Sequence, residues 1–336
     1  MADHTDGTPS SPRTQGPSQA SHPSALQVLA PTGTAVSTRR AMGSVVIAIA
    51  ILTLMDAGIK QLTATFGTPQ ILVMRYGAGF LVASLVLAVL LWLGRVDFPS
   101  VGAVKRSFQR SFLVLTVAMC FFYSLSVVPL ADATAIAFTA PLYLALLGWL
   151  VLKEPVSPRS WLAVVIGLIG VFIIASDAWA STGAFTGALS GYIAASIASL
   201  AYAGVLIMTR LHAASDPVPT MITLQSAFSG LLALPFLGLT VAGFAIDGRP
   251  FVLPDVDTLW LVLGIGVLGT SGHLFMAWGF KHAEAAKLGP MEYTSLLWAA
   301  FYGFLLFGEV PGWRLLVGCV FIIAGTWIVM RGEREA

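Results

Sequence analysis

The stretch from Ala131 to Ile173 recurs, without a gap, 155 residues further along the chain. Eleven of its 43 residue pairs are identical, where an apolar-rich composition would give roughly four by chance. The identities include a glutamate, an arginine and glycines, which a general excess of apolar residues does not explain. The chain is therefore predicted to consist of two homologous halves. The identical pairs are Ala131/Ala286, Thr139/Thr294, Leu142/Leu297, Ala145/Ala300, Gly148/Gly303, Leu150/Leu305, Glu154/Glu309, Arg159/Arg314, Val165/Val320, Gly170/Gly325 and Ile173/Ile328.

Both copies lie in strongly hydrophobic sequence. Of the 336 residues, 57% are hydrophobic and 10% are charged, whereas a soluble domain carries about 25% charged residues. Much of the surface must therefore face lipid, and the length leaves room for about ten spans of ~20 residues each. We predict an all-α integral membrane protein with ten transmembrane helices, arranged as two inverted five-helix repeats. The expected spans are residues 41–60, 69–94, 110–128, 131–152, 159–176, 186–209, 217–244, 257–280, 284–307 and 312–331.

The first 40 residues have a different composition from the rest of the chain. They are rich in Ser, Thr, Pro, Gly and Gln and contain no apolar run long enough for a signal-peptide core. We expect residues 1–40 to form a disordered cytoplasmic tail. The first repeat is then expected at residues 41–176, with spans one to five, and the second at residues 185–331, with spans six to ten.

The distribution of lysine and arginine predicts the orientation in the membrane. If the N-terminus is cytoplasmic, fourteen of the 18 Lys and Arg residues fall on the inside. The outer segments hold Lys60, Arg249 and Arg314, and Arg75 lies near the outer end of the second span. This bias predicts that both termini are cytoplasmic and that the protein lies in the cell's inner or plasma membrane. Because each half has an odd number of spans, the second half must cross in the opposite sense.

Three sets of motifs point to a known family. They are Ala131-Asp132-Ala133-Thr134-Ala135, Pro141-Leu142 and Leu152-Lys153-Glu154-Pro155 in the first half, Tyr293 and Leu305-Leu306-Phe307-Gly308-Glu309-Val310-Pro311 in the second half, and Arg75 in Met74-Arg75-Tyr76. Together they resemble EamA-type carriers of the drug/metabolite transporter superfamily. The resemblance covers residues 41–331 and leaves out the polar tail. Lys153 stands where the family commonly has glycine.

The resemblance implies a carrier with a central cavity between its halves, formed mainly by spans one to four and six to nine. Spans five and ten are implied to pack at the periphery, where a homodimer is an alternative to a monomer. Related carriers move amino acids, vitamins, nucleotide-derived metabolites or toxic organic compounds, in either direction.

Charged side chains inside the apolar spans are the first candidates for the transport site, because each costs at least ~2.5–3.5 kcal/mol to insert. Asp56 and Lys60 are four residues apart and can pair on one face of the first span. Arg75 lies near the same level, so Asp56 can serve Arg75 instead. Two interpretations remain open: a structural ion pair near the interface, or an Asp56–Arg75 pair that lines the cavity mouth and senses charge or protons.

Four further candidates lie in spans eight and nine. Glu292 is deep in its span, where an unpaired carboxyl group suits proton coupling, although hydrogen bonding to a neighbouring helix is an equal alternative. Tyr293 next to it can stack on a planar solute. His273 is either an interhelical hydrogen-bond donor or a cavity-lining, protonatable group. Trp278 can face lipid or offer a stacking surface in the cavity.

Other polar residues are predicted to shape the fold. Asp132 opens span four, where the helix dipole stabilises a carboxylate. Glu154 and Glu309 each end a span, and each is followed five residues later by an arginine, Arg159 or Arg314. We expect these glutamates to shape the turn by capping the next helix. Small residues predicted to allow close helix approach are Gly148, Gly167, Gly170, Gly318 and Gly325.

These features favour alternating-access transport of a small organic solute, with export as the expected direction and proton coupling as an open question. Uptake of a vitamin, an amino acid or a nucleotide-derived metabolite is the alternative. The net charge of +2 argues against a nucleic-acid partner, and the sequence has no Walker-type loop for ATP. An integral-membrane enzyme would need clustered polar chemistry, which is absent from the sequence. We expect no catalytic residue, metal or cofactor, and we expect Cys120 and Cys319 to be buried as small apolar groups.

Overall fold

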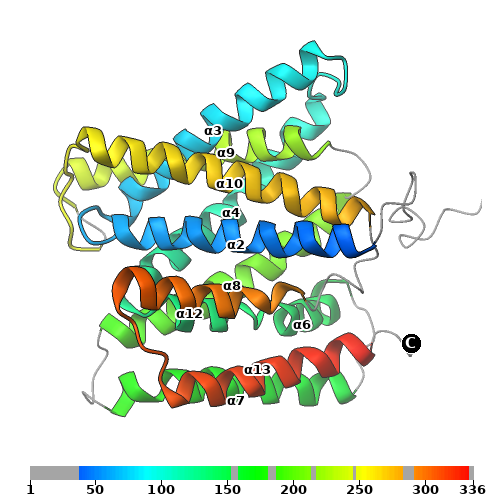
Figure 1. Cartoon of the computed structure of the whole chain (residues 1–336), viewed down its shortest axis with the longest axis vertical. Coiled ribbons are helices and arrows are strands. Elements are labelled where there is room, and N and C mark those ends of the chain that lie inside the picture. The colour runs from blue at the N-terminus through cyan, green and yellow to red at the C-terminus, as the bar shows by residue number, and fades with distance from the viewer. Residues whose placement is uncertain are drawn as a thin grey trace, which may run out of the picture.

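The computed structural model describes residues 38–152, 158–180, 187–212, 217–244, 247–282 and 291–332. Within these ranges the regular secondary structure is helical, and Figure 1 shows the helices lying roughly parallel or antiparallel in stacked layers. The helices are α2 (Thr38–Leu62), α3 (Thr68–Trp92), α4 (Val101–Val127), α5 (Leu130–Ala137), α6 (Ala140–Leu152), α7 (Pro158–Ala180), α8 (Gly187–His212), α9 (Val218–Val241), α10 (Val256–His282), α12 (Thr294–Phe307) and α13 (Trp313–Gly332).

The helices make up the ten membrane spans that the sequence predicts. In the described part of the chain, α2, α3, α4, α8, α9 and α10 are each long and apolar enough to cross a membrane. Shorter apolar segments, in α5 with α6, in α7, in α12 and in α13, supply the other four. The prediction of an all-α, ten-helix membrane protein is therefore confirmed.

The packing follows an inverted repeat in which α2 to α7 correspond to α8 to α13. Helix α2 packs on α10, and its counterpart α8 packs on α4, the counterpart of α10. The pairs α3–α9 and α7–α13 each join a helix to its own counterpart, as a pseudo-two-fold axis between the halves requires. In Figure 1, α2 begins near the end of the molecule where the C-terminus lies, and α8 begins at the opposite end. Helices α7 and α13 lie together at the edge, as the resemblance implied.

One predicted span is not a continuous helix. The apolar run 131–152 divides into α5 and α6, with Phe138 and Thr139 between them. The second half has a turn at the corresponding place, because Tyr293 separates helical Glu292 from α12, which begins at Thr294. The two aromatic residues at these breaks are repeat counterparts, and their ring centroids lie 5.3 Å apart. The helix breaks of the two halves therefore meet.

The two threonines at these breaks make the same hydrogen bond. The Thr139 hydroxyl donates to the Ile136 carbonyl at 2.7 Å, and the Thr294 hydroxyl donates to the Met291 carbonyl at 2.7 Å. The Ile136 carbonyl also accepts from the Thr139 amide at 2.9 Å, so the hydroxyl adds a second hydrogen bond to it. The two halves therefore share the same side-chain contact at corresponding positions.

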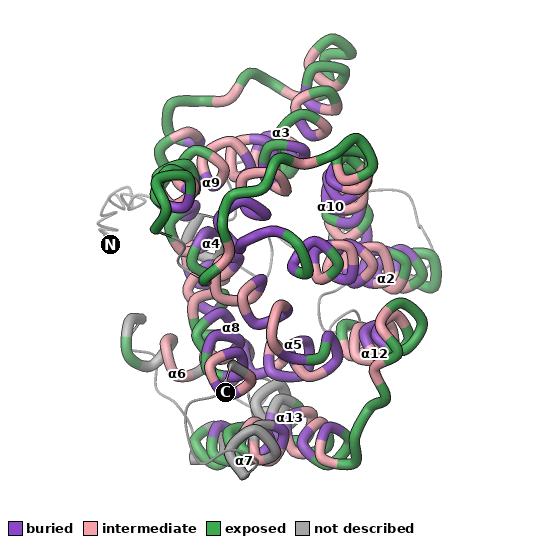
Figure 2. The backbone as a smooth tube through the Cα atoms, turned by 90° about the vertical axis from the view of Figure 1, so that its left-hand side faces the viewer, coloured by how far each residue is buried: buried purple, intermediate pink, exposed green. Residues whose placement is uncertain are grey.

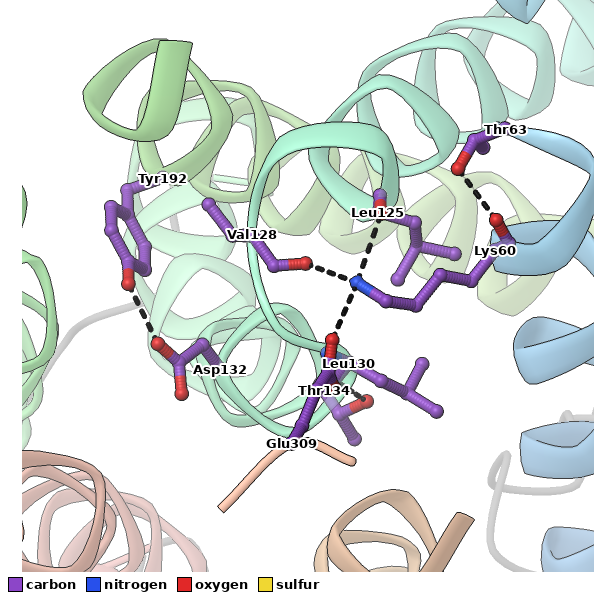
Figure 3. A network of polar contacts seen from close by, with 9 residues as sticks. All are labelled: Lys60, Thr63, Leu125, Val128, Leu130, Asp132, Thr134, Tyr192 and Glu309. Carbon is purple, nitrogen blue, oxygen red and sulfur yellow. Dashed lines mark hydrogen bonds and ion pairs between the residues drawn. The ribbon is translucent and has the colours of Figure 1, made fainter. Parts of the chain in front are cut away.

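The end of the molecule away from the termini is tied together by the ion pair of Lys60 and Glu309 (Figure 3). The Lys60 Nζ lies 2.9 Å from the Glu309 Oε1 and donates to the carbonyls of Leu125 and Val128. The Glu309 Oε2 accepts from the Leu130 amide at 2.9 Å. Glu309 therefore caps α5 in the other half, and the expectation that it caps the next helix, α13, is wrong.

The α9–α10 connection adds contacts between the halves at the same end. The Asp247 carboxylate accepts from the Thr68 amide at the start of α3. The Gln70 side chain donates to the Val252 carbonyl, and the Arg249 guanidinium donates to the Phe66 carbonyl at 3.4 Å. These contacts join the second half to the α2–α3 connection.

The other residues of the predicted repeat motif are placed as follows. Asp132 in the first turn of α5 accepts from the Tyr192 hydroxyl at 2.6 Å. The Arg314 guanidinium lies 5.1 Å from the centre of the Trp313 ring. Pro141 and Arg159 lie near the starts of α6 and α7, and their side chains are outside the described part of the structure. Glu154 is outside the described residues altogether.

Replacing Lys60 by Met removes the ammonium group and keeps the apolar stem. We expect a loss of about 1–3 kcal/mol in the free energy of unfolding, because the Glu309 carboxylate and the carbonyls of Leu125 and Val128 lose the ammonium group that they bind. Glu309→Gln should also destabilise, and the double variant should lose less than the sum, because no unpaired carboxylate remains. Thermal melts of the four proteins in detergent, followed by tryptophan fluorescence, test this coupling. Strictly additive losses would argue against an energetic pair.

Replacing Gly170 by Ala should force α7 and α13 apart. A Cβ at Gly170 would lie 2.7 Å from the Gly318 carbonyl oxygen and 2.8 Å from the Ile322 Cγ1. We expect a destabilisation of about 1–3 kcal/mol, because backbone has to move. Gly264→Ala in α10 is the matched control, since nothing lies within 4 Å of the added methyl group; it should be neutral or stabilising by up to about 1 kcal/mol. Equal melting temperatures for the two variants would contradict the packing argument.

Candidate functional site

Two adjoining hollows lie between the halves. The first, which we name the arginine chamber, has a volume of about 220 Å³, and the second, the glutamate chamber, about 310 Å³. Both are lined by Asp56, Phe121 and Tyr202. The remaining lining of the arginine chamber is Met55, Arg75, Tyr76, Val114, Val117, Ala118, Phe122, Val205, Ile222, Gln225, Ser226, Gly269, Thr270 and His273. The remaining lining of the glutamate chamber is Ile49, Leu52, Thr53, Thr134, Ala137, Phe138, Ala140, Leu206, Met276, Glu292 and Ser295.

The helices that line the chambers are those implied by the resemblance. The arginine chamber lies among α2, α3, α4, α8, α9 and α10, and the glutamate chamber among α2, α4, α5, α6, α8, α10 and α12. Neither α7 nor α13 supplies a described lining residue. Figure 2, which looks along the helices, shows α3, α9 and α10 on one side of α2 and α12 on the other.

Asp56 and Arg75 do not form the ion pairs considered for them. The ion pair within 4.0 Å in the described part of the chain is that of Lys60 and Glu309, so Lys60 is not available to Asp56. The Arg75 Nη2 lies 3.6 Å from the Met55 sulfur, and its guanidinium carbon lies 4.7 Å from the centre of the Tyr76 ring. Arg75 and Asp56 therefore face the arginine chamber together without a direct bond.

His273 lies in the middle of α10 and lines the arginine chamber. Its Nδ1 is 2.6 Å from the Gly269 carbonyl oxygen, one helical turn earlier. A carbonyl can only accept, so the Nδ1 carries the hydrogen, and in the neutral ring the Nε2 is left as an acceptor. His273 can therefore accept a hydrogen bond from a solute or a water molecule.

Glu292 lies on the turn that leads into α12, and its side chain is accessible in the glutamate chamber. Tyr293 does not line either chamber, but its ring packs on Phe138, which does. Trp278 is also absent from both linings, and its ring lies on His282 with centroids 4.5 Å apart. The structure thus brings Asp56, Arg75, His273 and Glu292 to the chambers, places Tyr293 behind one wall, and leaves Trp278 outside.

Several polar lining residues were not singled out from the sequence. They are Tyr76, Tyr202, Gln225, Ser226, Thr134 and Ser295. Gln225 and Ser226 adjoin each other in the apolar helix α9, and this local break in hydrophobicity was the available signal. Isolated tyrosines and threonines carry no such signal, because they also satisfy helix contacts.

The carboxylates of the site lack hydrogen-bond and ion-pair partners among the described residues. Neither Asp56 nor Glu292 makes such a contact there, and Arg75 contacts the Met55 sulfur and the Tyr76 ring. Charged groups at membrane depth persist where they face water or a ligand. The described residues also include no group of three or more His, Cys, Asp and Glu side chains that could hold a metal ion. The charged lining can bind a polar solute.

Comparison with known proteins supports this architecture. The model of the EamA-like transporter family matches residues 39–176 and 189–331. The pseudopaline exporter CntI of Pseudomonas aeruginosa is 26% identical over 292 residues, which cover 86% of this chain and 95% of the exporter. The S-adenosylmethionine uptake transporter of Rickettsia felis is 24% identical over 64% of this chain and 67% of its own length.

Other similarities are consistent with these. An uncharacterized transporter of Helicobacter pylori is 30% identical over 211 residues, which span 61% of this chain and 66% of that protein. A protein crystal structure with 18% sequence identity has a TM-score of 0.55 and covers 90% of this chain and 99% of its own. At this identity the likeness concerns the fold alone.

The two family matches coincide with the two inverted halves that enclose the chambers, and the relatives that span most of the chain are transporters. This chain therefore belongs to the EamA-like transporter family and is a multi-pass membrane transporter for a small-molecule solute.

Proposed function

We propose that this protein exports a small organic metabolite by alternating access and does not convert it chemically. The observation that carries the proposal is the pair of adjoining chambers between two inverted halves, whose lining includes Arg75 and the carboxylates of Asp56 and Glu292. In an inverted repeat, the halves can exchange conformations and so expose a central site to either side of the membrane. A central site between such halves is what a carrier requires.

The similarity to a described exporter supports export as the proposed direction, and the charge distribution supports the proposed orientation. The excess of Lys and Arg on the side of the termini favours a cytoplasmic location for both termini, in the inner or plasma membrane. With this orientation, the end joined by Lys60 and Glu309 faces outward. A relative that matches 86% of this chain is described as an exporter. A relative described as an S-adenosylmethionine uptake transporter makes uptake the competing direction.

Counterflow in proteoliposomes tests the transport function. The full chain is reconstituted, the vesicles are preloaded with one unlabelled compound, and entry of its labelled form is followed; the compounds are S-adenosylmethionine, riboflavin and the twenty amino acids. We expect exchange of at least one compound, recovered chemically unchanged. Recovery of a converted product would favour an enzyme, and no exchange in the whole panel would contradict the proposal. Inside-out and right-side-out membrane vesicles then separate export from uptake.

We further propose that a proton moves through Glu292. The titratable groups that face it in the glutamate chamber are Asp56 on α2 and Tyr202 on α8; residues 283–290, which precede it, are outside the described chain. A carboxylate that is accessible to the chamber and has no hydrogen-bond or ion-pair partner among the described residues can bind either a proton or a cationic solute. Competition between the two would couple solute exit to proton entry.

Replacing Glu292 by Gln should abolish this coupling. We expect solute movement driven by a pH gradient, acid on the outer side, to fall to the level of protein-free vesicles, because the amide cannot release a proton. The protein should still reach the membrane at wild-type level. Asp257→Asn is the matched control, since this carboxylate lies in the exposed first turn of α10, away from both chambers. Unchanged gradient-driven transport in Glu292→Gln would remove this residue from proton coupling.

A further inference from the structure

We infer that the solute is amphoteric: it carries an anionic group that binds Arg75, a protonated nitrogen that binds Glu292, and an apolar or aromatic connector between them. This inference rests on the proposed transport function and adds the chemical class of the solute. It follows from which charged groups line each chamber and from what lies between them.

The arginine chamber provides the site for the anionic group. The guanidinium of Arg75 has five N–H donors in a planar fork that matches a carboxylate. Its contacts with the Met55 sulfur and the Tyr76 ring leave its charge without a carboxylate within 4.0 Å in the described chain. Gln225 and Ser226 of α9 line the same chamber and add neutral polar groups. A carboxylate or a similar oxyanion is the group that these residues fit.

The glutamate chamber provides the site for the cationic group. Glu292 lines this chamber and Arg75 does not, so the two opposite charges belong to different chambers. Asp56 lines both, which adds a second negative charge between them. A monoanionic solute would face two carboxylates, and a neutral solute would leave Glu292 without an opposite charge in its own chamber. A solute with a protonated nitrogen at the Glu292 end removes both costs.

The boundary between the chambers sets the form of the connector. Phe121 and Tyr202 line both chambers, so the middle of a solute that occupies both passes these two aromatic rings. Arg75 comes from α3, which packs on α9 and α10, whereas Glu292 precedes α12, which packs on α2 and α5. These helices lie on opposite sides of α2 (Figure 2), and packed helices are about 8–10 Å apart. A solute whose two charges share one carbon atom reaches only one chamber.

Three matched compounds test the inference on the full-length protein. 4-(Aminomethyl)benzoate has both charged ends on a flat connector, 4-methylbenzoate lacks the amine, and 4-methylbenzylamine lacks the carboxylate. Binding is measured by titration calorimetry in detergent. We expect the first compound to bind at least about tenfold more tightly than either of the others, because each charged end makes a charge-assisted contact. Equal affinities, or no binding of 4-(aminomethyl)benzoate, would overturn the inference.

Two variants separate recognition from a merely structural role. Arg75→Gln should lose affinity for 4-(aminomethyl)benzoate and keep that for 4-methylbenzylamine, whereas Glu292→Gln should lose affinity for 4-(aminomethyl)benzoate and keep that for 4-methylbenzoate. A variant that only misfolds would lose affinity for all three compounds. In that case Arg75→Lys and Glu292→Asp are the variants to measure. Each keeps the charge and should still bind 4-(aminomethyl)benzoate more tightly than the two singly charged compounds. The inference fails, while the transport function stands, if the counterflow assay exchanges a neutral or purely anionic solute and these preferences are absent.

Discussion

A backbone amide or carbonyl without a partner costs several kcal/mol in hydrocarbon, and polar side chains supply partners where helices of this fold end. Thr139 and Thr294 each donate to a carbonyl at the break of a membrane span. Lys60 satisfies two carbonyls at the end of α4, and Glu309 satisfies the amide of Leu130 at the start of α5. Because Lys60 and Glu309 come from different halves, the contacts that satisfy this interruption also hold the halves together.

The sequence was sufficient for the architecture, because composition and repetition constrain it directly. Apolar runs identify membrane spans, and the 155-residue repeat with five spans per half determines that the halves are inverted. The break between α5 and α6 was missed because residues 131–152 are mostly apolar and form one run of the length of a membrane span. Pro141, which cannot donate a backbone hydrogen bond, was the available signal. The Lys60–Glu309 pair was missed because helical spacing indicates partners within one helix and gives no information on partners in the other half.

The candidate site was predictable to the extent that it depends on charge. Asp56, Arg75, His273 and Glu292 stand out in apolar sequence and all line the chambers. Trp278 was a weaker candidate, because an aromatic residue in an apolar helix carries no sign of which way it faces, and its ring lies on His282. What the sequence does not contain is the division of the charges between two chambers, since that depends on which helices become neighbours.

The backbone of this protein is pseudo-symmetric, but the chemistry of its chambers is not. Ala137 and Glu292 are repeat counterparts and line the same chamber, yet one is apolar and the other is a carboxylic acid. Phe138 and Tyr293 are counterparts as well and lie in contact where the two halves meet. Exchange of conformations between the halves requires only similar backbones, whereas recognition requires charges at unequal positions. A solute held by an arginine at one end and a glutamate at the other therefore keeps one orientation while the two halves around it exchange conformations.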